Sequence, residues 1–64
     1  MVQINGESYN VSGKSLDAVL ADLNFDAKKI AVEINEDIVP KANYPQVLLK
    51  DGDTVEVVSF VGGG

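Results

Sequence analysis

Apolar and polar residues alternate on both sides of an Asn5-Gly6 pair near the start of the chain. A two-residue Asn-Gly loop places both of its residues at positive φ, in the type I′ geometry that joins two antiparallel strands. Residues 1–11 are therefore predicted to form a hairpin in which Val2 faces Tyr9. One face of the hairpin is assigned to the core, and it carries Val2, Ile4, Tyr9 and Val11.

The apolar spacing then changes to three and four residues, which predicts an amphipathic helix from about Ser15 to Leu23. Ser15 is a suitable N-cap, and Asp17 lies in the first turn, where the helix dipole favours an anion. Asn24 suits the C-terminal end of the helix, and Phe25 is expected to pack back against it. The stripe that faces the core is expected to consist of Leu16, Val19, Leu20 and Leu23.

Alternation returns between Ile30 and Ile34, which predicts a strand with one covered face. Asn35-Glu36-Asp37 is expected to turn this strand into a short Ile38-Val39 piece. Pro40 cannot donate a backbone hydrogen bond, so it should stop further pairing. The stretch from Lys41 to Gln46 is predicted to be a loop or a short 3₁₀ turn. The chain therefore crosses irregularly from this strand to the next one.

A tight turn at Asp51-Gly52-Asp53 is predicted to lead into the last strand, Thr54 to Val61. The order is hairpin, helix, strand, irregular crossing and strand, and the only helix can cover one face of a single sheet. This order predicts an α+β fold of the β-grasp (ubiquitin-like) kind, with one mixed sheet packed on one helix. All 64 residues are expected to form a single domain, 1–64. Cores of this size without disulfides seldom supply more than about 3–5 kcal/mol.

Alternation along the last strand separates its side chains into two faces. Val55 and Val57 continue the core pattern, so Val58 and Phe60 fall on the face that the helix does not cover. An exposed Val58–Phe60 pair is predicted to be a partner-docking patch. The alternatives are that the loop from Lys41 to Gln46 folds over the pair, or that the strand is buried on both faces.

The composition excludes most enzyme chemistry, because the chain has no Cys and no His. It can form no disulfide, no zinc or iron–sulfur site of the usual ligands, and no nucleophile activated by imidazole. Five lysines against ten Asp and Glu residues give a net charge of −5 at pH 7, which argues against nucleic acid as a partner. No apolar run approaches the roughly 20 residues of a membrane helix, and no secretory signal is recognised. A soluble, cytoplasmic protein is expected.

The acidic residues Asp51, Asp53 and Glu56 are close enough in sequence to suggest a cation site. A calcium-binding loop, however, spreads its ligands over about twelve residues. Turn chemistry is the better interpretation, and neither a metal nor another cofactor is expected. One helix on a small sheet offers little concavity in which to perturb a carboxylate pKa. The chain is therefore not expected to be an enzyme.

Gly62, Gly63 and Gly64 end the sequence. They are either a plain frayed end or a flexible tail (62–64) that is itself a substrate. Three glycines extend at most about 10 Å and can pass through a slot too narrow for a side chain. The Gly64 carboxylate becomes a good electrophile only when an oxygen is made into a leaving group, as in an adenylate. A partner would have to supply that chemistry.

The stretch from Asp51 to Gly64, a strand that begins with Asp-Gly-Asp and runs into terminal glycines, resembles the ThiS family of thiamine-biosynthesis sulfur carriers. The stretches Asn35 to Pro40 and Leu49 to Asp53 are similar to the middle of that family. The resemblance covers essentially the whole chain.

This resemblance implies that Gly64 is adenylated and converted to a thiocarboxylate that donates sulfur for thiazole formation. Gly63 would be the other half of the required Gly-Gly pair, and Gly62 would extend the tail. The implied partners are an E1-like adenylyltransferase, a thiazole synthase and a cysteine desulfurase as the sulfur source. The chain would be a carrier and co-substrate, not a catalyst. Its net charge further predicts that a partner presents a basic surface.

Three other functions remain open. The small subunit of molybdopterin synthase shares the fold and the Gly-Gly end, but it is usually longer and favours prolines where Ser59-Phe60-Val61 stands here. The chain could also be a non-catalytic interaction module, or a protein modifier whose Gly64 forms an isopeptide bond with a lysine. The carrier and the modifier both need a free Gly64, whereas an interaction module does not.

Overall fold

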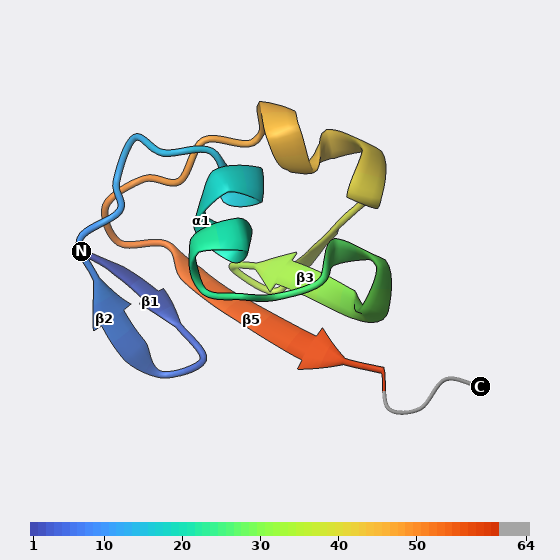
Figure 1. Ribbon diagram of the computed structural model, residues 1–64. Helices are drawn as coiled ribbons and strands as arrows, with labels where there is room; N and C mark the ends of the chain where they lie inside the picture. Colours follow the sequence, from blue (N-terminus) through green and yellow to red (C-terminus); the bar gives the residue numbers. More distant parts are fainter. Residues whose placement is uncertain (61–64) are drawn as a thin grey trace.

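Within residues 1–60, which the computed structural model describes, five strands form one mixed sheet and one α-helix packs against it (Figure 1). The strands are β1 (Val2–Ile4), β2 (Glu7–Tyr9), β3 (Ile30–Ile34), β4 (Asp37–Val39) and β5 (Thr54–Ser59). They lie in the order β2-β1-β5-β3-β4. β5 is central, because it pairs in parallel with β1 and antiparallel with β3. The helices are α1 (Leu16–Asp22) and the 3₁₀ helices η1 (Ala27–Lys29) and η2 (Lys41–Gln46). This arrangement confirms the predicted β-grasp fold.

Both hairpins turn through two residues at positive φ, as type I′ geometry requires. In the first turn φ is 51° at Asn5 and 86° at Gly6. Val2 faces Tyr9 across this hairpin, as predicted, although β2 ends at Tyr9 rather than near residue 11. The second turn uses residues 35–36 alone, so Asp37 already belongs to β4 and pairs with Ile34.

The helix α1 begins and ends through local sequence signals. The Ser15 hydroxyl accepts a hydrogen bond from the Ala18 N–H at 3.2 Å, which is the predicted N-cap. At the other end Asn24 has a φ of 65°, and the N–H of Phe25 bonds to the carbonyl of Leu20 at 2.9 Å. This bond, with the one from the Asn24 N–H to the Ala21 carbonyl, closes the helix as a Schellman motif.

The core lies between α1 and the sheet, and η2 helps to close it. Tyr44, in η2, is only 2% exposed, although the sequence predicts only a loop or a short 3₁₀ turn for this stretch. The buried hydrophobic residues are Val2, Ile4, Leu16, Val19, Leu20, Ile30, Val32, Tyr44, Leu49, Val55 and Val57. The predicted core members Tyr9, Val11, Leu23 and Phe25 are only partly buried against this cluster. The face assignment of β5 is confirmed, because Val55 and Val57 point into the core.

No helix in residues 1–60 combines the length and the hydropathy needed to cross a membrane.

Candidate functional site

The candidate site is the end of β5, from which the chain continues toward its glycines. On the β1 side, the carbonyls of Asp53, just before β5, and of Val55 in β5 accept the N–H groups of Gln3 and Asn5, each at 2.9 Å. On the other side β5 stays in register with β3 as far as Ser59. One further bond, from the Phe60 N–H to the Lys29 carbonyl at 2.7 Å, holds the end of the described chain. The direction in which the chain leaves the sheet is therefore set by hydrogen bonds up to Phe60.

The residues to which the sulfur chemistry was assigned, Gly62, Gly63 and Gly64, lie outside the described residues, as does Val61. The structure therefore describes the strand that carries this segment and not the segment itself. The assigned roles of the glycines stay predictions.

Val58 and Phe60, the predicted docking pair, are exposed by 60% and 53%. Val58 lies opposite Ala31 of β3. The segment η2 packs chiefly against α1 and leaves the pair accessible, so neither alternative drawn from the sequence holds. The side chains are placed as a docking surface requires, and their role in docking stays a prediction.

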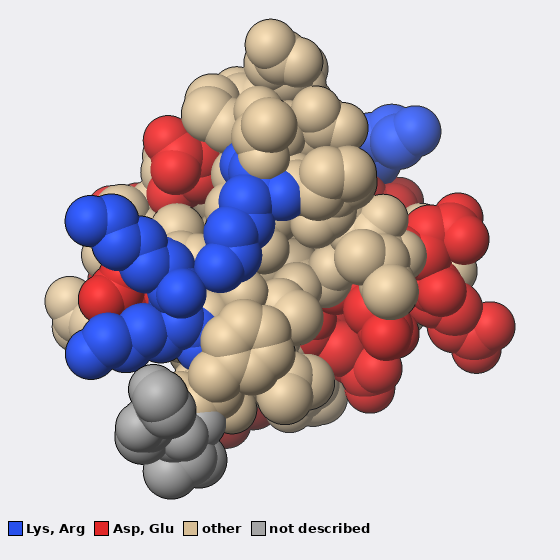
Figure 2. All heavy atoms as spheres, turned by 90° about the vertical axis from the view of Figure 1, so that its right-hand side faces the viewer, with Lys and Arg blue, Asp and Glu red and all other residues tan. Residues whose placement is uncertain are grey.

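Three lysines lie near the Phe60 end of β5, and we refer to Lys28, Lys29 and Lys41 as the lysine collar. The ammonium of Lys41 lies 5.7 Å from the centre of the Phe60 ring, within the range of a cation–π interaction. The same ammonium donates a hydrogen bond to the Lys28 carbonyl at 3.2 Å. Figure 2 shows the face toward which β5 runs, with lysine side chains gathered on one side and most of the acidic atoms in view on the other.

Asp26 holds the collar segment η1 in shape. Its carboxylate accepts the Lys28 N–H at 3.0 Å, and its backbone carbonyl accepts the Lys29 N–H at 2.9 Å. The collar was not predicted from the sequence. The adjacent Lys28 and Lys29 were a visible signal, but nothing local placed Lys41 or Phe60 beside them.

The acidic residues of the turn before β5 bond to the protein itself. The two Asp53 carboxylate oxygens accept the Lys50 N–H at 2.9 Å and the Asn35 side-chain amide at 3.0 Å. Asp51 is exposed and accepts from the N-terminal amino group and from the Ser12 hydroxyl. The hydrogen bond from the amino group has the largest effect and lowers the pKa of Asp51. The hydrogen bond from Ser12 lowers it further. In the described part of the chain, no three acidic side chains are grouped to hold a metal ion.

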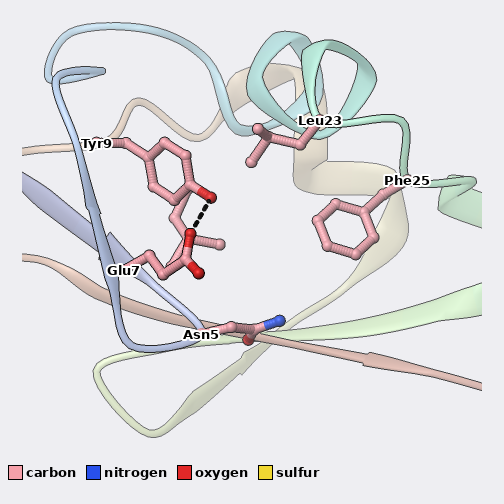
Figure 3. A pocket seen from close by; sticks show the side chains of 6 residues that line it. Asn5, Glu7, Tyr9, Leu23 and Phe25 are labelled. Atoms are coloured by element: carbon pink, nitrogen blue, oxygen red, sulfur yellow. Dashed lines mark hydrogen bonds between the residues drawn. The ribbon is translucent and has the colours of Figure 1, made fainter.

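Two shallow hollows lie away from the end of β5. The larger, about 360 Å³, is lined by Asn35, Glu36, Thr54 and Glu56 near the start of that strand. The other, about 240 Å³, lies between the first hairpin and the end of α1 (Figure 3). In it the Tyr9 hydroxyl donates to the Glu7 carboxylate at 3.1 Å, and this bond raises the pKa of Tyr9. Neither hollow brings together a nucleophile, a base and a buried partner, so neither has the arrangement of a catalytic site.

Comparison with known proteins identifies the family. The model of the ThiS family matches residues 2–64. The chain belongs to the ThiS family. It is 41% identical to the sulfur carrier protein ThiS of Thermus thermophilus over 64 residues, covering 100% of both chains. The crystal structure of a thiamine biosynthesis protein (ThiS) from Geobacter metallireducens superposes with a TM-score of 0.77 at 27% identity, covering 98% of this chain and 97% of that one. The family predicted from the sequence is thereby confirmed.

A thiazole synthase of Paramagnetospirillum magneticum is 50% identical to this chain over 62 residues. These residues are 95% of this chain and 19% of that protein, so the chain spans about a fifth of the length of this relative. The similarity therefore reaches a segment of that synthase and not its whole length.

Proposed function

We propose that this protein is a sulfur carrier of thiamine biosynthesis, and that its Gly64 carboxylate is the group that carries the sulfur. The observation that supports this most strongly is the family match, which runs from residue 2 to residue 64 and so includes all three glycines. A relative aligned over its full length has the name sulfur carrier protein ThiS. The proposal requires Gly64 to be a free C-terminus.

The chemistry begins at a carboxylate that is unreactive by itself. In an E1-like adenylyltransferase, a Gly64 oxygen attacks the α-phosphate of ATP and releases pyrophosphate, which leaves an acyl adenylate. The terminal sulfur of a cysteine desulfurase persulfide then displaces AMP, which gives an acyl disulfide. A thiol attacks the desulfurase-side sulfur of that bond, which forms a new disulfide and releases the thiocarboxylate. The chain has no Cys, so the thiols come from its partners. The protein acts as co-substrate in each step and not as catalyst.

The structure supports this role through the way β5 is held. The strand lies in the middle of the sheet and is bonded to both neighbours. A partner that binds Phe60 and Val58 would therefore be approached by the following segment from a defined direction. Three glycines beyond Val61 add at most about 10 Å, so the docking surface lies within a short reach of the reacting carboxylate.

Thiazole synthase is proposed as the enzyme that accepts the sulfur. The Paramagnetospirillum protein named thiazole synthase contains a segment similar to this chain within its own polypeptide. Joining two partners in one chain raises their effective concentration, which is useful when one delivers a group to the other.

The test is ATP–pyrophosphate exchange by the cognate adenylyltransferase, with circular dichroism on each variant. Wild type should support exchange, whereas removal of Gly64, or one residue added after it, should abolish exchange and leave the fold intact. Intact mass of the protein from sulfur-replete cells should show one oxygen replaced by sulfur. Undiminished exchange after removal of Gly64 would contradict the carrier role, and an isopeptide-linked conjugate in place of the thiocarboxylate would indicate a modifier.

A further inference from the structure

The five lysines of this acidic protein form two groups at opposite ends of β5. The lysine collar, Lys28, Lys29 and Lys41, lies beside the end of the strand at Phe60. Lys14 and Lys50 lie before its start, where the Leu49 N–H bonds to the Lys14 carbonyl at 2.9 Å. The net charge of −5 therefore conceals a basic region at the place where a partner must approach the glycines.

The collar and Phe60 form one connected surface. The Lys41 side chain is held by its hydrogen bond to the Lys28 carbonyl and by its contact with the Phe60 ring. It therefore loses less rotamer freedom on binding than an unrestrained lysine would. The Phe60 backbone is fixed to Lys29, yet its side chain is still 53% exposed. The acidic residue of this segment is Asp26, whose carboxylate is engaged by the Lys28 N–H. The result is an accessible aromatic ring with the Lys41 ammonium against it and the backbone of Lys28 and Lys29 close by.

We infer that the lysine collar and Phe60 dock against an acidic protein surface that has an apolar recess for the aromatic ring. This inference rests on the proposed function, because it assumes that a partner protein reaches the segment beyond Phe60. An aromatic anchor with a polar, solvent-accessible rim around it is the usual anatomy of a protein interface. A phosphate group could pair with the lysine ammonium groups, but it would make no apolar contact with the Phe60 ring.

A partner surface that fits the collar is acidic, whereas the net charge of the chain predicts a basic one. At physiological ionic strength the Debye length is about 8 Å, whereas the longest dimension of the molecule is 35 Å. Charges more than about one Debye length from Phe60 are therefore largely screened from a partner there, whereas the Lys41 ammonium, 5.7 Å from the centre of the ring, is not. Local charge, and not net charge, then decides how fast the partner associates.

The experiment compares two double charge reversals that change the net charge equally. Lys29→Glu with Lys41→Glu alters the collar, and Lys14→Glu with Lys50→Glu alters the opposite end. Association with the purified cognate adenylyltransferase is followed by stopped-flow at rising NaCl. The collar variant should associate about tenfold more slowly at low salt and lose most of its salt dependence. The control variant should stay within about twofold of wild type.

A second collar variant, Lys28→Glu with Lys29→Glu, leaves Lys41 in place on the Phe60 ring and should show the same loss. Equal effects of the collar and control reversals, or faster association of a collar variant, would overturn the inference. So would a change confined to the KM for ATP, which would assign the collar to nucleotide phosphate. Exchange activity of wild type at saturating enzyme tests the proposed function separately, because it does not depend on the association rate.

Discussion

The side-chain amide of Asn5 forms two hydrogen bonds with the backbone of Val57, donating to its carbonyl at 3.2 Å and accepting from its N–H at 2.8 Å. The last paired residues of β1 and β5 are Ile4 and Val55. The Asn5 amide therefore takes the place of the next residue of β1 after the chain has turned away at Gly6. It extends the support of β5 toward the end that carries the candidate site.

Substitutions at Asn5 should separate the contribution of these two hydrogen bonds to the free energy of unfolding from the contribution of the turn. Asn5→Gly keeps a residue suited to the φ of 51° and loses both bonds, so we expect a loss of about 1–3 kcal/mol in the free energy of unfolding. Asn5→Ala loses the bonds and also strains the turn, which should cost about 1 kcal/mol more. Urea unfolding measures both variants. Equal stabilities of wild type and Asn5→Gly would show that the amide pairing contributes nothing.

A charge at Val57 and a charge at Phe60 should have opposite consequences. Val57 is 7% exposed, so Val57→Asp buries a carboxylate without a partner and should leave the chain unfolded at 25 °C. Phe60→Asp alters a half-exposed side chain, so the domain should keep its circular dichroism spectrum and bind the adenylyltransferase at least tenfold more weakly, as truncation of an interface hot spot does. Folding is followed by thermal melts, and binding by titration calorimetry. A folded Phe60→Asp variant with unchanged affinity would remove Phe60 from the docking surface.

Acid stability should depend on Asp51. The N-terminal amino group and Ser12 hold the pKa of this carboxyl below its ordinary value, so its bonds favour the folded state while the group is ionised. This contribution is present above the unfolded pKa, near 3.8, and is lost as the pH falls through the lower folded pKa.

Asp51→Asn should therefore lower the melting temperature at pH 5 and weaken its pH dependence below pH 4. The effect should be small, since the side chain is 77% exposed. Asp22→Asn, which removes an exposed carboxylate from α1, is the matched control. The same pH profile for Asp51→Asn and wild type would contradict the assignment.

The hydroxyl of Tyr44 is buried, and no described residue gives it a hydrogen bond. Burial raises the pKa of Tyr44, and the nearby Val32 backbone offsets a smaller part of this rise without forming a bond of good geometry. Tyr44→Phe should leave the free energy of unfolding unchanged or raise it by about 1 kcal/mol, because an unsatisfied polar group is removed. Tyr44→Ala should cost about 3–5 kcal/mol through loss of core packing. A loss of more than 1 kcal/mol in Tyr44→Phe, measured by urea unfolding, would reveal a bonded hydroxyl.

Short-range signals in the sequence were enough to predict most elements of this protein. The Asn5-Gly6 turn and the Ser15 cap depend on contacts within a few residues, so local chemistry alone specifies them. The faces of β5 follow from strand alternation, because successive side chains point to opposite sides. The glycines that end the sequence led to the same family that the comparisons show. Boundaries were less certain, as the early end of β2 shows, because the last residues of a strand depend on the neighbour with which they pair.

Tertiary structure alone decided which distant residues meet. Asn5 lies 52 positions from Val57, and nothing near either residue marks the pair. Tyr44 is buried because η2 packs against α1, which its own polar neighbours do not indicate. The lysine collar likewise requires η1, η2 and the end of β5 to come together in space. Net charge is a sum over the chain, whereas a partner responds to charges within about one Debye length, so only the folded arrangement sets the sign of the surface beside Phe60.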